Sequence, residues 1–283
     1  VAKSLAVDTL ARVIGGTSVR LQFTPDLVPS DIIGTRVYRP SKEDFEVELG
    51  PVFANLVLAD EINRAPAKVQ SALLEVMAER QVSLAGTTYP LPNPFVVMAT
   101  QNPLESEGVY PLPEAQLDRF LLKVHVPTPS IGDELEIVRR MSVDRPVAEQ
   151  VMTLGQLIAL QRATDDVFVH HAVADYAVRL VMATREPTER GVPELAPLVS
   201  HGASPRGSLG LVAAARATAL LRGRSYALPS DVADVAVDVL SHRLVLTYDA
   251  LADGVPARRL IEQVLAVTSQ PAIAPSQLAE GAA

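Results

Sequence analysis

The sequence predicts an α/β fold in which a core built on a parallel sheet is followed by a domain made of helices. Two short apolar runs, at residues 56–59 and 95–99, have the composition of strands buried on both faces, which is typical of parallel sheets. Strand-like and helix-like stretches alternate through the first part of the chain, as they do in α/β cores. Beyond Pro127 and Pro129 helical patterns take over, so this proline pair marks the boundary between the two parts.

The first elements of the core are a helix, a strand and a long connection. The helical pattern at residues 1–14 ends at the pair Gly15-Gly16, which is a stop signal for a helix. Residues 18–24 alternate apolar and polar side chains, as an outer strand does. The proline- and glycine-rich connection at 25–53 follows, and we expect a functional insertion there, because connections this long are rarely filler.

The later elements of the core are a helix, a hairpin and a last strand. A helix is predicted at about 66–80, with a buried apolar stripe and a proline tolerated in its first turn. The segment 82–91 is predicted to form a hairpin that turns near Ala85-Gly86. A last strand is predicted at 120–126.

The second part of the chain is predicted to be all-helical. The helices are expected at about 131–142, 153–163, 170–185, 205–222, 230–246 and 256–267. We therefore divide the chain into a core at 1–127, a helical domain at 128–270 and a tail at 271–283. The tail is rich in alanine and proline and is expected to be loose.

Two adjacent carboxylates, Asp60 and Glu61, stand where the strand at 56–59 leaves the predicted sheet. Ligands of open α/β sheets bind at this carboxyl edge of the strands. There one acid can hold Mg²⁺ through water, and its neighbour can polarise an attacking water. This arrangement is the Walker B element of nucleotide hydrolases. The alternative is a strand that ends in a solvated acidic turn.

Asn102 and Arg119 are two further candidates. Asn102 lies just past the strand at 95–99, where a neutral amide can orient water and touch a γ-phosphate without adding negative charge. The alternative is an ordinary Asn-Pro turn. Arg119 stands between a short helical turn and a predicted strand, and it is either a surface partner of Asp118 or an arginine finger that reaches a neighbouring subunit's nucleotide.

Arg206 breaks a local rule of helix composition. Ser204-Pro205 has the pattern of an N-cap followed by proline at the first helical position. Arg206 then falls in the first turn, where the helix dipole disfavours a cation by some tenths of a kcal/mol. A bound phosphate would reverse that sign, because helix N-termini and arginine both attract anions. The alternative is a solvent-facing arginine paired with an acid.

Composition excludes several classes of protein. The chain of 283 residues is long enough to bury a substantial core, and charged residues interrupt its apolar runs before they reach membrane-spanning length. The absence of cysteine excludes disulfides and thiolate zinc sites. A formal charge of −8 argues against a basic nucleic-acid groove. We expect a cytoplasmic enzyme that does not insert into membranes and has no nucleic-acid partner.

These residues together resemble the MoxR family of AAA+ ATPases over nearly the whole chain. The segments that carry the resemblance are FTPDLVPSDIIG (23–34), ADEINRAP (59–66), ATQNP (99–103), EAQLDRF (114–120) and GASPR (202–206). The Asp-Leu-x-Pro-Ser-Asp run within the first segment is specific for this family, whereas Asp60-Glu61 by itself is not.

The resemblance implies a bacterial ATPase with five parallel core strands and a helical lid, assembled as a ring, commonly a hexamer, with ATP and Mg²⁺. Asp60 would bind the magnesium shell and Glu61 would be the catalytic base. Asn102 would be sensor 1, Arg119 the arginine finger that acts in trans, and Arg206 would be sensor 2 at the nucleotide.

The family pattern also assigns the two irregular parts of the core. The connection at 25–53 resembles a helix-two insert, and 82–91 resembles a pre-sensor-1 hairpin. Relatives often act as chaperones that remodel or mature partner complexes, frequently with proteins that carry a von Willebrand factor A domain.

One departure from the family pattern is the missing phosphate-binding loop, because G-x-x-x-x-G-K-[ST] does not occur in the sequence. We therefore expect a fragment that lacks the first core strand and this loop and is inactive alone. Residues 95–100 and 120–126 should then not pair but flank a strand-wide slot, with the acidic site facing a void. The alternatives are a non-hydrolysing ring or adaptor module and a DNA-directed AAA+ motor.

Overall fold

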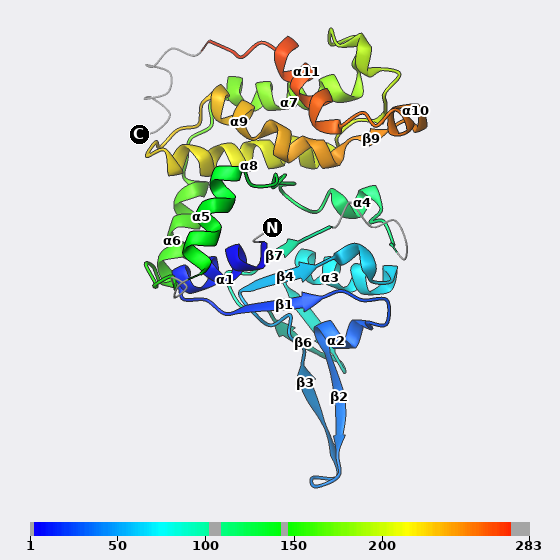
Figure 1. Cartoon of the computed structure of the whole chain (residues 1–283), viewed down its shortest axis with the longest axis vertical. Coiled ribbons are helices and arrows are strands. Elements are labelled where there is room, and N and C mark those ends of the chain that lie inside the picture. The colour runs from blue at the N-terminus through cyan, green and yellow to red at the C-terminus, as the bar shows by residue number, and fades with distance from the viewer. Residues whose placement is uncertain (1–2, 102–108, 143–146, 273–283) are drawn as a thin grey trace. The chain divides into compact units, whose positions relative to one another are not determined.

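A computed structural model of the chain describes residues 3–101, 109–142 and 147–272, and these form two compact units (Figure 1). The sheet unit comprises Val1–Leu112 and Val126–Ala159, and the helical unit comprises Pro113–His125 and Leu160–Ala283. These limits differ from the single boundary expected near Pro127. The domain limits drawn from the sequence therefore stay a prediction.

The sheet unit is built on three parallel strands in the order β1-β4-β7. They are β1 (Ser18–Gln22), β4 (Leu56–Asp60) and β7 (Val96–Ala99). The central strand β4 is buried over its first four residues, as its apolar run predicted. Val57 lies opposite Val19 on one side and Val97 on the other, so the carboxyl ends of the three strands meet at one edge.

The buried side chain of Asn55 fixes the start of this sheet. Its oxygen accepts hydrogen bonds from the backbone N–H and the hydroxyl of Thr17, at 3.1 and 3.2 Å. Its amide donates to the carbonyl of Pro94 at 2.8 Å. Because Thr17 precedes β1 and Pro94 precedes β7, one side chain holds the register of all three strands.

The longer helices described in the sheet unit are α1 (Lys3–Ile14), α3 (Ala67–Glu79) and α5 (Ile131–Met141), and α6 (Leu154–Asp165) begins there. One face of α1 packs on β4, where Val7, Ala11 and Ile14 form a buried cluster with Leu56 and Leu58. The helical pattern at residues 1–14 had instead predicted a face of Ala6, Leu10, Val13 and Ile14. Of these only Ile14 is buried, whereas Ala6 and Leu10 are exposed, so the predicted face is wrong.

The long connection at 25–53 folds into α2 (Pro29–Ile33) and an antiparallel hairpin of β2 (Gly34–Arg39) and β3 (Asp44–Leu49). Figure 1 shows this hairpin extending away from the three-stranded sheet. The second predicted hairpin is also present, as β5 (Gln81–Leu84) and β6 (Thr87–Pro90). It turns at Ala85 and Gly86, both with positive φ, which is the geometry of a type I′ turn.

The helical unit packs four main helices around one core. These are α7 (His171–Arg185), α8 (Pro205–Leu221), α9 (Pro229–Leu240) and α11 (Ala257–Val267). Side chains of Tyr176, Leu180, Leu211 and Leu240 are fully buried in it. The smaller elements are α4 (Glu114–Leu117), β8 (Val199–His201), β9 (Val245–Leu246) and α10 (Tyr248–Ala252), and the 3₁₀ turns of the chain are Ile62–Arg64, Pro193–Leu195 and Ser241–Arg243.

Two sequence predictions are wrong in this unit. The helix expected at 230–246 ends at Leu240, and Val245–Leu246 instead pairs antiparallel with β8, so strands do not end at Pro127. The strand expected at 120–126 does not form. Its backbone is bonded within the helical unit, where the N–H of Lys123 donates to the carbonyl of Asp238 at 2.8 Å.

Residues 95–100 and 120–126 do not pair in the described ranges, as expected. Residues 120–126 do not form a strand, however, so the prediction of a strand-wide slot flanked by two strands is wrong.

Candidate functional site

Asp60 and Glu61 lie at the carboxyl edge of the sheet, and Thr100 joins them to the neighbouring strand. The Thr100 hydroxyl donates to Asp60 Oδ1 at 2.5 Å and accepts the N–H of Glu61 at 2.9 Å. Thr100 directly follows β7, so its position depends on the β4–β7 register. The sequence placed Asp60 and Glu61 at this edge but gave Thr100 no part in holding them.

The Asp60 carboxylate also pairs with an arginine from β1. Nη2 and Nε of Arg20 lie 2.6 and 3.0 Å from Asp60 Oδ2. Burial raises the pKa of Asp60, but hydrogen bonds from Thr100 and Arg20 and the positive charges of Arg20 and Lys3 outweigh it, so the pKa lies below its ordinary value. Asp60 is therefore an anion at neutral pH.

Glu61 turns the chain out of the sheet in the left-handed conformation, with φ 55° and ψ 49°. For a residue with a side chain this conformation costs about 1–2 kcal/mol, and such residues concentrate at functional sites. Its carboxylate lies 3.0 Å from Arg64 Nε and 3.4 Å from the side-chain amide of Gln22. The sequence predicted that these two acids face a void. In the described part of the chain they face arginines instead, because Arg20 pairs with Asp60 and Arg64 pairs with Glu61.

Gln70 holds the turn that follows Glu61. Its amide nitrogen lies 3.2, 3.1 and 2.9 Å from the carbonyl oxygens of Ile62, Ala65 and Tyr110. The side chain is fully buried in α3. This role of Gln70 was not predicted from the sequence, although a glutamine inside the apolar stripe of the predicted helix was a usable signal.

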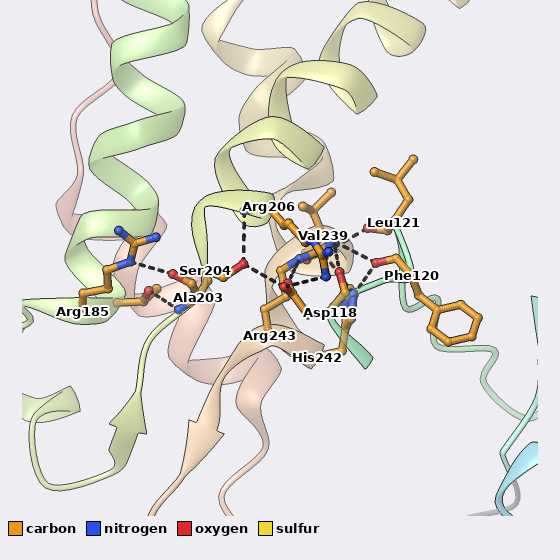
Figure 2. A network of polar contacts seen from close by, with 11 residues as sticks. Asp118, Phe120, Leu121, Arg185, Ala203, Ser204, Arg206, Val239, His242 and Arg243 are labelled. Carbon is orange, nitrogen blue, oxygen red and sulfur yellow. Dashed lines mark hydrogen bonds and ion pairs between the residues drawn. The ribbon is translucent and has the colours of Figure 1, made fainter. Parts of the chain in front are cut away.

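A second group of candidate residues lies in the helical unit (Figure 2). Ser204 caps α8 by accepting the N–H of Arg206 at 3.1 Å, and Pro205 occupies the first position, as predicted. Ser204 also donates to Asp118 Oδ2 at 2.8 Å. Arg206 Nη1 lies 3.7 Å from the same oxygen, so the alternative of an arginine paired with an acid describes this contact.

The remaining candidates are Arg119 and Asn102. Arg119 lies two positions beyond the end of α4, and its N–H donates to the carbonyl of Gln116 at 3.2 Å. Asn102, predicted as the polar contact to a γ-phosphate, lies outside the described residues.

The donor set at the sheet edge fits Mg²⁺. The Asp60 carboxylate and the Thr100 hydroxyl are hard oxygen ligands, and Mg²⁺ keeps several waters while binding one or two carboxylates and substrate phosphates. No cluster of three or more His, Cys, Asp or Glu that could cage a metal occurs in ranges 3–101, 109–142 and 147–272. A cation held largely by water and phosphate needs no such cage.

Comparison with known proteins decides the family. The chain is 60% identical to the chaperone MoxR1 of Mycobacterium tuberculosis over 273 residues, which cover 96% of this chain and 72% of the relative. The chain belongs to the MoxR family of AAA+ ATPases. A second MoxR protein, from Paracoccus denitrificans, is 31% identical over 95% of this chain and 84% of its own length.

The two parts of this MoxR chain match two family models. The model of the ATPase family associated with various cellular activities matches residues 1–122, and the AAA lid domain matches 195–264. A crystal structure from Cytophaga hutchinsonii, provisionally named an ATPase, superposes with a TM-score of 0.90 at 45% identity, over 96% of this chain and 83% of that one. The sheet core followed by a helical lid is thereby confirmed. No helix in the described residues is long and apolar enough to cross a membrane.

Proposed function

We propose that this MoxR chain supplies the catalytic carboxylates and sensor arginines of a ring-forming ATPase that remodels or matures a partner protein complex. The observation that carries the proposal is the pair Asp60-Glu61 at the end of the central buried strand, held by Thr100 from the next strand. The identity to the chaperone MoxR1 supports the remodelling role. A partner with a von Willebrand factor A domain is the class that the family favours.

The residues at the sheet edge have separate proposed roles in ATP hydrolysis. Asp60 and Thr100 would hold Mg²⁺, which when bound would neutralise the charge that develops on the transferred phosphate. Arg20 pairs with Oδ2 of Asp60, whereas Thr100 contacts Oδ1, and Arg20 would have to release Oδ2 for that oxygen to face the ion. Glu61 accepts the proton of the attacking water, and its contact with Arg64 is exchanged for that water.

The arginines of the helical unit act on phosphate charge. Arg206 lies in the first turn of α8 with a side chain 55% exposed, and it can exchange Asp118 for a phosphate of the nucleotide bound by its own subunit. Arg119 acts on the nucleotide of the neighbouring subunit, as an arginine finger in trans. This division of roles requires a ring, and six subunits is the proposed number.

Mixing two inactive variants tests the ring and the trans role together. The printed sequence has no phosphate-binding loop. The experiment therefore uses a version of the protein that carries such a loop ahead of Val1. Subunits with Arg119→Ala keep Glu61 but offer no finger, and subunits with Glu61→Gln offer a finger but cannot hydrolyse. Each variant should be nearly inactive alone, and mixed rings should regain ATP hydrolysis.

The control is a mixture of Arg119→Ala subunits with Arg119→Ala, Glu61→Gln subunits, which supplies no finger and should stay inactive. If no mixing ratio restores hydrolysis although mixed rings form, Arg119 has a role within its own subunit or in structure. If the unmutated protein itself neither binds nor hydrolyses ATP, the chain is an adaptor module instead.

A further inference from the structure

We propose that Asp118 and Arg243 are positioning residues that tie Arg119 to the helix that carries Arg206. Through them, the nucleotide sensed by a subunit sets the position of the finger that it offers to its neighbour. The inference rests on the proposed roles of Arg119 and Arg206. It assigns a task to Arg243, which the proposed chemistry leaves unused, and a second task to Asp118, which that chemistry uses only as the partner that Arg206 exchanges.

Arg243 clamps the backbone on both sides of Arg119. Its side chain is 3% exposed, and its Nε lies 3.0 Å from Asp118 Oδ1. Its Nη atoms donate to the carbonyls of Phe120 and Leu121, at 2.8 and 3.1 Å. Figure 2 shows these bonds converging on the guanidinium. Residue 119 is therefore flanked by groups that one buried side chain holds.

The other oxygen of Asp118 faces the first turn of α8. Oδ2 accepts the hydroxyl of Ser204 at 2.8 Å and lies 3.7 Å from Arg206 Nη1 (Figure 2). One carboxylate thus joins the clamp around residue 119 to the cap and the sensor of α8. When Arg206 turns to a phosphate, Asp118 loses one of its two cationic partners and keeps Arg243. Binding of nucleotide therefore changes the contacts that hold the backbone around Arg119.

A second buried ion pair in the same unit shows what a local pair looks like. Arg224 Nη2 lies 2.6 Å from Oδ1 of Asp231, whose side chain is fully buried. These two residues are only seven positions apart, and their pair stabilises the start of α9. Arg243 and Asp118 are 125 positions apart. The distant pair joins two functional segments, whereas the local pair provides a control of similar chemistry.

The test places Arg243→Gln in the subunit that donates the finger. Rings combine Arg119→Ala acceptors with donors that carry Glu61→Gln, and the reference donor has no further change. Since a misplacement of 1 Å can cost about 10²-fold in rate, Arg243→Gln donors should restore at least tenfold less hydrolysis than reference donors. Donors with Arg224→Gln should restore the reference rate. Arg243→Gln placed in the acceptors should reduce the rate less, because acceptors need no finger of their own.

Hydrogen exchange provides a readout that does not depend on activity. In the unliganded protein the amide of Lys123, which is bonded to the carbonyl of Asp238, should exchange faster in Arg243→Gln than in Arg224→Gln. Arg243→Lys keeps a cation beside Asp118 but reaches fewer carbonyls, so this donor should fall between Arg243→Gln and the reference. If Arg243→Gln rings do not assemble, a rate for Arg243→Lys donors below the reference supports the inference.

Each failure has its own meaning. The inference is overturned if Arg243→Gln donors restore the full reference rate. Where Arg243→Gln rings do not assemble, the same result with Arg243→Lys donors overturns it. Equal losses with Arg224→Gln donors also overturn it, because any damage to the helical unit would then act alike. A reference mixture that shows no recovery refutes the proposed trans role of Arg119 instead.

Discussion

His242 is buried beside the clamp formed by Arg243 and Asp118, and its protonation is coupled to the stability of that region. Its Nε2 lies 2.9 Å from the carbonyl of Phe120 and 3.0 Å from Arg243 Nη1, which donates to the carbonyls of Leu121 and Val239. Its Nδ1 has no hydrogen-bond partner in the described residues. A neutral ring that donates from Nε2 leaves a bare acceptor at Nδ1, whereas the other tautomer would leave a buried N–H unpaired. The first tautomer is therefore favoured.

Acid should weaken the fold through His242. Burial lowers the pKa of His242 to about 4, opposed by the bond to Phe120 and helped by the charges of Arg243 and Lys123. The unfolded chain takes up a proton near pH 6.5, while the folded protein does so only near pH 4. The free energy of unfolding should thus fall by up to ~3 kcal/mol between these values as the pH drops. Urea unfolding of His242→Gln, which keeps a donor there but cannot titrate, should lack this loss; the same pH dependence in both proteins would contradict it.

Single residues were predicted from the sequence where the signal was local. The cap by Ser204, Pro205 at the first helical position and the acids at the end of β4 depend on neighbours in the chain, and the structure has them there. The contacts of Asp60 with Arg20 and of Asp118 with Arg243 depend on residues 40 and 125 positions away. No spacing rule relates such residues, so these pairs could not be predicted.

The element that positions Arg206 is α8, and the loop before it lies against α7. A Cβ on Gly202 would lie 2.4 Å from the carbonyl oxygen of Thr184 and 2.7 Å from the nitrogen of Arg185. Both are backbone atoms and cannot swing aside. The Thr184 hydroxyl also accepts the N–H of Ala203 at 3.0 Å. Gly202 therefore sets the distance at which the start of α8 meets the end of α7.

Gly202→Ala should destabilise the protein by about 1–3 kcal/mol, the usual cost of overpacking. Thermal or urea unfolding measures this. Gly132→Ala is a matched control, because its Cβ would meet nothing closer than the Ser130 hydroxyl at 3.8 Å, and replacing a helical glycine by alanine gains roughly 0.5–1 kcal/mol. Equal stability of the Gly202→Ala and unmutated proteins would show that α7 and α8 can separate without cost.

The elements were predicted well where a run of residues determines its own structure. The three strands of the sheet, α3 and the β5–β6 hairpin lie within a few residues of their predicted bounds. The segment 120–126 has apolar residues at strand-like spacing but forms no strand, because Arg243 and Asp238 take its backbone groups. The apolar pattern of this segment does not show whether its backbone will bond to a neighbouring strand or to these distant groups.

At the scale of the whole molecule, two compact units carry different parts of one proposed function. The sheet unit holds Asp60 and Glu61, and the helical unit holds Arg119 and Arg206. The family membership establishes the AAA+ fold of this chain. The central claim is that Glu61 activates water for ATP hydrolysis, since the sensor and finger roles have meaning only around that step.

The most direct test replaces Glu61 by glutamine in the protein that carries a phosphate-binding loop ahead of Val1. Loss of a positioned general base should lower turnover by about 10²–10⁴-fold. ATP binding, measured by equilibrium titration, should stay unchanged, because the lost group acts on water and not on the nucleotide. The exposed Glu79 at the end of α3 provides the control variant Glu79→Gln, which should hydrolyse ATP normally. Turnover of Glu61→Gln within about threefold of the unmutated rate, far less than a general base contributes, would contradict the account.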